Sequence, residues 1–337
     1  MQKKTKLGFS ADKNEMTDKL YLYSVARIRS KELGLFSRSD IDQLMNCRTE
    51  AECLRYLNDK GWGDESSQTS EQILVSEREK TWELLNELVE DISVFNTFRY
   101  GNDYHNLKAA IKQTYKGDTT PNLFLSNGTV EPEVIIKAVS EHDFSLLPDY
   151  MREVAEEAYQ IQLRTGDSQL CDIVLDKAAL DRMYSHGKAS ENELLSQYVE
   201  LKVAAADINI AIRSLRTKKD EDFLRRALCE CESLDINKLI KCALEGMDAI
   251  YDYLETTVYA DGVQELKKSS QAFERWCDNR IIEFIRPQKY NPFTLSPLAA
   301  YLLARENEIK TVRILLSGKR NDISDDIIRE RLREMYV

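Results

Sequence analysis

The chain has 337 residues, of which 42% are hydrophobic and 31% are charged, and its formal net charge is −11. A protein that binds nucleic acid through phosphates needs a basic surface, so this average charge argues against that function. Glycines and prolines are few for this length, so turn signals are sparse and the composition favours long helices over many short strands. The length allows two or three domains, each large enough to bury a core.

The first third of the chain predicts helices joined by capped turns. They are expected at residues 18–35, 39–46, 49–57 and 71–101. Ser39, and the pair Thr49 and Glu52, are expected to cap the second and third of these helices, because a side-chain oxygen there can accept a free backbone N–H. Residues 103–115 continue or kink the long fourth helix, and residues 116–121 mark the first domain boundary.

The rest of the chain repeats this order of short helices and one long helix. We expect helices at residues 133–140, 147–165, 191–216, 221–227, 235–243 and 245–287, from residue 297 onward, and after Ser324. The apolar residues of the long helices step by four and three, which predicts bundles packed lengthwise. Gly318 is expected to end the last long helix as a left-handed cap, and residues 217–220 mark the second boundary. No stretch alternates convincingly like a strand, so the predicted fold class is all-α.

One short pattern recurs along the chain, in which acid or amide residues are followed by an apolar residue and a base. The base is Lys108 in the first copy, Arg213 in the second and Arg313 in the third, at intervals of 105 and 100 positions. This predicts one helical unit of about a hundred residues that is used three times. The three helical domains are expected at residues 1–116, 117–218 and 219–337.

None of the usual catalytic or ligand-binding patterns stands out in the sequence. The three histidines have no second histidine or cysteine at metal-ligand spacing, and Cys229 and Cys231 are too close together for a zinc ribbon. There is no phosphate-binding glycine loop, no nucleophile elbow and no carboxylate pair spaced as a general acid and base. We therefore expect no catalytic, cofactor or metal site. An enzyme with a site built from scattered carboxylates stays open as an alternative.

The seven cysteines include no Cys-x-x-Cys pair, and their number is odd. No secretory signal is recognisable, so we expect reduced, mostly structural thiols in a cytosolic protein. The longest apolar stretch, residues 298–304, is far too short to span a bilayer. If the protein works at a membrane, we expect it to do so by holding on to another protein.

Two acid–base pairs lie five positions apart on predicted helices: Asp103 with Lys108, and Glu308 with Arg313. At this spacing the side chains point about 140 degrees apart, so they are not the neighbours that lock a single helix. Each charge either joins neighbouring helices of one bundle or contacts another protein. Arg305 lies in an apolar stripe, where a base needs an acidic partner or an exposed cavity because an unpaired buried charge is costly.

Three stretches of the chain carry a family resemblance: residues 21–35 (YLYSVARIRSKELGL), 103–108 (DYHNLK) and 306–319 (ENEIKTVRILLSGK). They resemble, in the same order, the signature stretches of the V-type (V/A-type) ATP synthase C-subunit family, which is related to the d subunit of the eukaryotic vacuolar ATPase. The resemblance covers nearly the whole chain. It implies a funnel of three pseudo-symmetric helical domains with a central cavity, placed between a membrane rotor ring and a soluble central shaft. It also implies a non-catalytic component, without a cofactor, that passes rotation between the catalytic head and the ring.

From this resemblance we expect a cytoplasmic protein, peripheral to the membrane, whose partners are the shaft and the ring of a complex for proton or sodium transport. Its predicted partner-binding residues are Tyr23, Arg27, Arg29, Tyr104, Lys108, Arg305, Glu308 and Arg313. The residues expected to line the central cavity are Asp103, Asp207, Arg305 and Glu308. The alternative class is a helical scaffold or adaptor that binds peptides or partner helices in a groove.

Overall fold

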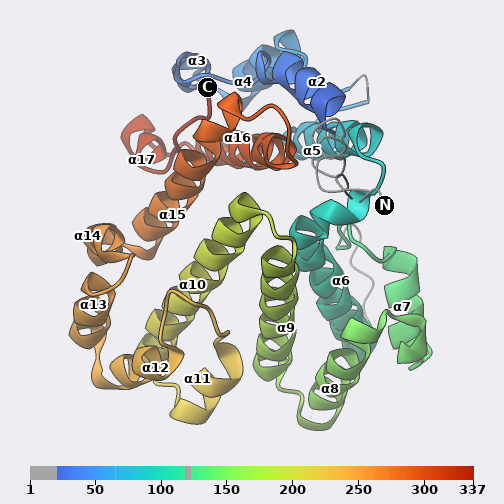
Figure 1. The fold of residues 1–337 in the computed structure, drawn as a ribbon, viewed down its shortest axis with the longest axis vertical. Helices are drawn as coiled ribbons and strands as arrows, with labels where there is room; N and C mark the ends of the chain where they lie inside the picture. The colour runs from blue at the N-terminus through green and yellow to red at the C-terminus, as the bar shows by residue number, and fades with distance from the viewer. Residues whose placement is uncertain (1–20, 65, 118–122) are drawn as a thin grey trace, which may run out of the picture. The chain divides into compact units, whose positions relative to one another are not determined.

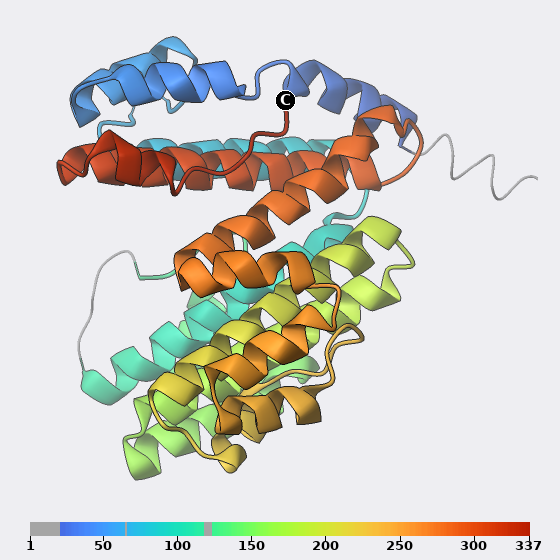
Figure 2. The same ribbon diagram turned by 90° about the vertical axis from the view of Figure 1, so that its left-hand side faces the viewer.

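The structure is a computed structural model that describes residues 21–64, 66–117 and 123–337. Every regular element of these residues is a helix, which confirms the predicted all-α class (Figures 1 and 2). The chain divides into two compact units: Met1–Ile92 with Glu274–Val337, here called the terminal unit, and Ser93–Phe273, here called the middle unit. The three predicted domains stay a prediction. In the described part of the chain, no helix combines the length and the apolar character that crossing a bilayer requires.

The terminal unit is built around the long helix α16. Its helices are α2 (Leu22–Glu32), α3 (Arg38–Asn46), α4 (Glu50–Asp59), α5 (Ser70–Leu88), most of α15 (Ser270–Ile285), η3 (Arg286–Tyr290), α16 (Ser296–Arg320) and α17 (Asp325–Arg329). Helix α16 packs against α2, α3, α4, α5 and α17, so most of its surface is buried. The cap of α3 is Ser37 with Asp40 in a capping box, not the predicted Ser39. Thr49 caps α4 as predicted, by accepting from the Glu52 N–H.

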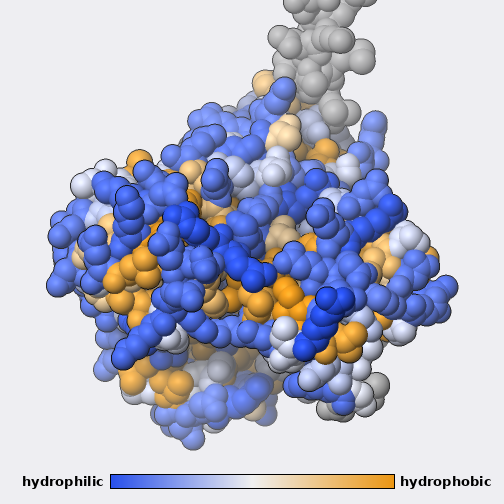
Figure 3. Space-filling model, turned by 90° about the horizontal axis from the view of Figure 1, so that it is seen from below, coloured by the Kyte–Doolittle hydropathy of each residue, from blue (hydrophilic) through white to orange (hydrophobic). Residues whose placement is uncertain are grey.

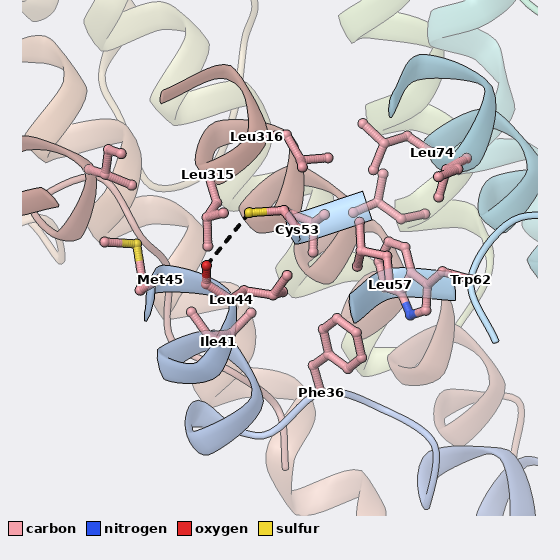
Figure 4. Packing of buried hydrophobic residues seen from close by; sticks show 14 of the residues in the cluster. Phe36, Ile41, Leu44, Met45, Cys53, Leu57, Trp62, Leu74, Leu315 and Leu316 are labelled. Carbon is pink, nitrogen blue, oxygen red and sulfur yellow. Dashed lines mark hydrogen bonds between the residues drawn. The ribbon is translucent and has the colours of Figure 1, made fainter. Parts of the chain in front are cut away.

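The core of the terminal unit forms where α3 and α4 pack on α16. Figure 4 shows Leu44, Cys53 and Leu316 among the apolar side chains that meet there. The rings of Phe36 and Trp62 stack at one side of this cluster, with centroids 5.0 Å apart. These residues are at most 5% exposed. Burial of apolar side chains contributed by segments far apart in the sequence therefore holds the N-terminal helices to α16.

The middle unit contains three long helices and the shorter helices that pack on them. They are α6 (Asn96–Lys116), α7 (Pro132–Ser140), η2 (Phe144–Leu146), α8 (Asp149–Thr165), α9 (Ser168–Ala189), α10 (Glu193–Arg216), α11 (Glu221–Ala227), α12 (Ile236–Glu245), α13 (Met247–Glu255) and α14 (Ala260–Lys268). The element η1 (Ile92–Phe95) leads into α6. Helix α9 packs against α6, α8, α10 and α11. It was not predicted, because a helix covered by several neighbours shows no single apolar stripe.

Two predicted long helices are broken in the structure. The helix expected at 71–101 ends at Leu88, where the β-branched Val89 is extended and the Leu88 carbonyl accepts from the Ser24 hydroxyl at 2.6 Å. The helix expected at 245–287 is α13, α14 and α15. Its first break follows Thr256 and Thr257, whose hydroxyls donate back to helix carbonyls and compete with the backbone.

Gly318 does not end the last long helix, which continues to Arg320. A Cβ at Gly318 would lie 2.5 Å from Ile328 Cδ1, so the glycine lets α17 pack closely on α16. The prediction of a left-handed cap there was wrong. The glycine serves the close approach of two helices, not a turn.

Candidate functional site

Three long helices each carry one buried carboxylic acid: Asp103 on α6, Asp207 on α10 and Glu308 on α16. Their exposed fractions are 0%, 0% and 1%. Each accepts a hydrogen bond from a backbone N–H of a neighbouring non-helical segment. They follow one another at intervals of about a hundred residues, as the repeated sequence pattern does. The three positions therefore form a recurring local arrangement.

Of the three acids, Asp103 accepts the most hydrogen bonds from uncharged groups. It accepts from the N–H of Thr129 at 2.7 Å, from the N–H of Val130 at 3.1 Å and from the Thr129 hydroxyl at 2.6 Å. Burial raises the pKa of Asp103, while these hydrogen bonds oppose the rise. A Cβ at Gly128 would lie 2.4 Å from Asp103 Oδ1, so the loop can approach the carboxylate only with glycine there.

Glu308 belongs to a charged cluster, here called the Arg305 network, in which Arg305, Glu308 and Glu77 are buried and Lys80 is exposed. Glu308 accepts from the Phe36 N–H and from Arg305 Nη1, and Arg305 Nη2 lies 2.5 Å from Glu77 Oε2. Lys80 Nζ lies 2.7 Å from Glu77 Oε1. The buried guanidinium thus pairs with two buried carboxylates, and the exposed Lys80 adds a second positive charge beside Glu77. Such pairing is the condition for keeping the three charges buried.

The Arg305 network joins segments far apart in the sequence. Glu77 Oε1 also accepts from the Gly63 N–H at 2.9 Å, and the Arg305 guanidinium lies 5.0 Å from the centre of the Trp62 ring. The segment before α3, the 61–63 turn, α5 and α16 all meet at this point. The sequence predicted that Arg305 needs an acidic partner, and the structure supplies two. Which acids they are could not be predicted, because Glu77 is distant in the sequence.

Asp207 has the poorest set of partners. It accepts from the Cys229 N–H at 3.1 Å, and its Oδ2 has no hydrogen-bond partner among the described residues. Burial raises the pKa of Asp207 to about 7; the Cys229 N–H and Lys177 oppose the rise, and Asp181 adds to it. Lys177 instead donates to the Leu228 carbonyl. The acid on α10 is therefore buried without a neutralising partner.

The bases of the two predicted acid–base pairs each contact an acid on another helix of the same chain. Lys108 Nζ lies 2.5 Å from Asp176 Oδ1 on α9, and Arg313 Nη2 lies 2.9 Å from Glu71 Oε1 on α5. Of the two alternatives left open by the spacing, joining neighbouring helices is the one that these bases adopt. The partners lie 68 and 242 positions away, which is why spacing alone did not identify them.

The eight predicted partner-binding residues differ widely in exposure. Three are buried, with exposed fractions of 2%, 6% and 1%: Tyr104, Arg305 and Glu308. Three are half-buried and bonded within the chain: Arg29, Lys108 and Arg313. Tyr23, at 70%, and Arg27 are exposed on α2. The exposed pair is the part of the prediction that a partner could reach without a rearrangement of this chain.

The expectation that four charged side chains line an open cavity was wrong. Asp103, Asp207, Arg305 and Glu308 are each at most 6% exposed, and each is bonded inside its own unit. A side chain that lines an accessible passage would be in contact with solvent. These four are enclosed by the packed helices instead.

A cleft of about 340 Å³ opens between α6, α8 and α9 in the middle unit. The Arg182 guanidinium lies over the rings of Tyr150 and Tyr100, at 4.2 and 4.9 Å from their centres, and its Nε has no hydrogen-bond acceptor among the described residues. Three carboxylic acids also line the cleft: Glu153, Glu157 and Asp181. Such a surface suits contact with a segment of mixed charge.

The described residues contain no group of three or more histidine, cysteine, aspartate or glutamate side chains placed to hold a metal ion. Figure 3 shows one face of the molecule, on which hydrophilic residues predominate and apolar residues form patches between them.

Comparison with known proteins gives one consistent result. A family model described as ATP synthase (C/AC39) subunit matches residues 24–331. The C subunit of the V-type sodium ATPase of Enterococcus hirae is 23% identical over 318 residues, which cover 92% of this chain and 97% of that protein. The C subunit of the A-type ATP synthase of Thermococcus kodakarensis is 21% identical over 337 residues, which cover 94% of this chain and 91% of that protein.

Proposed function

Because the chain belongs to the ATP synthase (C/AC39) subunit family, we propose that it is a non-catalytic central-stalk subunit of a rotary V/A-type ATPase. In this role it links the central shaft to the membrane rotor ring and transmits torque for proton or sodium transport. The family match over residues 24–331 is the observation that carries the proposal. The protein would act on the cytoplasmic side, attached to the membrane through the complex.

The packing within each unit supports this role, because a part that transmits torque must resist deformation. Long helices packed along their length are stiff, and charges buried in pairs add directional contacts between them. In the terminal unit, the Arg305 network joins α16 to α5 and to the segment before α3. In the middle unit, Asp103 fixes the loop before α7 to α6.

We keep the threefold organisation as part of the proposal, with domains at residues 1–116, 117–218 and 219–337 around a central cavity. The recurrence of a buried acid on α6, α10 and α16 supports a repeated unit. Partner contacts are proposed at the exposed α2 residues Tyr23 and Arg27.

The alternative of a helical scaffold has one observation in its favour, the cleft that contains Arg182. An arginine nitrogen withdrawn from solvent without an acceptor is unfavourable in the free chain, by about 1–3 kcal/mol for a typical buried polar group. A bound segment that shifted the Arg182 side chain could supply the acceptor. A scaffold of this kind would bind partners unrelated to an ATPase.

The test is purification of the full chain, carrying an affinity tag, from detergent-solubilised membranes. Recovery of shaft and ring proteins in fixed proportion supports the stalk role, whereas their absence, with other partners recovered, favours the scaffold. The double variant Tyr23→Ala with Arg27→Glu should weaken recovery of one of the two partners. Arg164→Glu, an equally exposed base on α8, is the matched control and should leave recovery unchanged.

A further inference from the structure

Two of the seven cysteines lie against the same backbone carbonyl in the terminal unit. Cys47 is the residue that ends α3, and its N–H donates to the Leu44 oxygen at 3.2 Å. Cys53, on α4, donates its thiol to the same oxygen at 3.6 Å (Figure 4). The tight turn between α3 and α4 and the first residues of α4 separate the two residues in the chain. The fold therefore holds the backbone of one cysteine and the sulfur of the other at one point.

The two thiols are neighbours with different access to solvent. Cys53 is fully buried in the core cluster, and the half-buried Cys47 packs against that same cluster. Burial raises the pKa of Cys53 to about 12, and the neighbouring Cys47 thiol adds to this rise. The Cys47 thiol donates to the Gln43 carbonyl at 3.7 Å in an exposed contact, so a soluble reagent reaches Cys47 before the buried Cys53.

Cys229 and Cys231 are not arranged in this way. The groups that perturb the pKa of Cys229 after burial are Asp181, Asp207 and Lys177, with no second thiol among them. The same holds for Cys231, whose neighbours include Glu200. Proximity in the sequence does not create a thiol pair there, although Cys229 and Cys231 are separated by one residue only.

We propose that Cys47 and Cys53 are a site of reversible oxidation, at which hydrogen peroxide closes an intrachain disulfide. The Cys47 thiolate attacks one peroxide oxygen, the O–O bond breaks, and the released hydroxide takes up a proton to give water and a Cys47 sulfenic acid. The Cys53 sulfur then attacks the Cys47 sulfur and forms the S–S bond. The hydroxyl of the sulfenic acid leaves with the Cys53 proton as a second water. Two thiols are oxidised, one peroxide is reduced, and a dithiol reductant reverses the reaction.

The bond would connect the end of α3 covalently to α4, where both pack on α16. Lys319 of α16 donates to the Met45 carbonyl at 2.7 Å beside this corner, so the last residue of the 306–319 signature stretch lies at the same place. The closed loop is short, so little entropic stabilisation of the whole fold is expected. The effect is local fixation of the α3–α4 corner. The inference does not depend on the proposed function.

The chain itself provides a clean assay, because Arg48 lies between the two cysteines. Trypsin cuts after Arg38, Arg48 and Arg55, so Cys47 and Cys53 fall on the separate peptides 39–48 and 49–55. The full chain is treated with hydrogen peroxide, its remaining thiols are alkylated, and the digest is analysed by mass spectrometry. The proposal expects these two peptides joined, with the loss of two hydrogen atoms, and separated again by dithiothreitol.

Matched variants distinguish the pair from general oxidation. Cys47→Ser should abolish the joined peptides, and Cys53→Ser should leave a Cys47 sulfenic acid that dimedone traps. Cys231→Ser, which removes another half-buried thiol, should change neither result. The proposal is overturned if the folded chain gives peptides 39–48 and 49–55 separately, with Cys47 oxidised to sulfinic acid and Cys53 alkylated. It is also overturned if the joined peptides form as fast in urea, because the fold would then have no part in bringing the thiols together.

Discussion

The terminal and middle units both bury a carboxylic acid against a backbone N–H, but they treat it differently. Glu308 in the terminal unit forms an ion pair with Arg305, and Arg305 also forms an ion pair with Glu77. Asp207 in the middle unit has one N–H donor, and its second oxygen has no partner among the described residues. Burial alone therefore does not decide how such a group behaves. Burial raises the pKa of both acids, and the neighbouring donors and charges decide how strongly that rise is opposed: by Arg305 and the Phe36 N–H at Glu308, and by the Cys229 N–H and Lys177 at Asp207.

Removal of the guanidinium from the Arg305 network should produce the largest effect. Arg305→Met leaves Glu308 and Glu77 buried without their shared cation, which should lower the free energy of unfolding by about 3–5 kcal/mol. Urea denaturation followed by circular dichroism measures it. Lys267→Met is the control, because its ion pair with Glu255 is 41% and 47% exposed and should be worth about 0–1 kcal/mol. Equal losses of unfolding free energy in the two variants would mean that the buried Arg305 network contributes no more stability than an exposed ion pair.

Asp207 should make stability depend on pH in the opposite direction to a paired acid. Its pKa is raised from 3.8 to about 7, so the folded chain holds this proton more tightly than the unfolded chain does. The resulting stability is full below pH 3.8 and is lost as the pH rises through about 7. Relative to Asp207→Asn, the unmodified protein should lose about 2 kcal/mol between pH 5 and pH 8.

Urea denaturation of both proteins at several pH values measures that difference. Comparison with Asp207→Asn removes the contributions of all other titrating groups that the two proteins share. Parallel pH profiles would show that Asp207 is ionised across the whole range, and the claim that burial raises its pKa would then be wrong.

The loop that meets Asp103 should be sensitive to a single methyl group. In Gly128→Ala the new Cβ would lie 2.4 Å from Asp103 Oδ1, so the loop must shift and its hydrogen bonds weaken. The expected loss in stability is about 1–3 kcal/mol. Gly101→Ala is the control, because Gly101 lies on α6, the helix of Asp103, and a Cβ there would have nothing within 4 Å. This substitution should be neutral or stabilising. Thermal denaturation compares the two, and a stable Gly128→Ala protein would argue against a closely fixed loop.

The largely exposed pair of Arg313 and Glu71, with side chains 42% and 66% exposed, should show the smallest effect. Arg313→Gln should cost about 0–1 kcal/mol, and the difference should shrink further in high salt because solvent screens the pair. Denaturation at low and high ionic strength measures it. A loss of unfolding free energy as large as that of Arg305→Met would show that Arg313 behaves as a buried charge.

The sequence predicted well those features that depend on local periodicity. The all-α class, the long helices near 193–216 and 296–320, and the need of Arg305 for an acid all followed from the spacing of apolar and charged residues. The breaks at Val89 and Thr256 were missed because an extended residue or a returning hydroxyl interrupts a helix without disturbing its apolar pattern.

Tertiary partners could not be predicted from one chain without its fold. The spacing indicated that Lys108 and Arg313 have their partners outside their own helices. Their partners, Asp176 and Glu71, become neighbours only when the helices pack. The same limit explains the wrong assignment of Asp103 and Glu308 to an open cavity. A charged residue in an apolar stripe can face solvent or a buried partner, and the sequence does not distinguish these.

The central claim, that this chain couples rotation to ion transport, is tested most directly by recording ATP hydrolysis and ion uptake together. The vesicles would carry the ATPase either with this chain or without it. We predict that without the chain the catalytic head still hydrolyses ATP while ion uptake stops, and that adding back the full chain restores uptake. Undiminished ion uptake in vesicles that lack the chain would contradict the account.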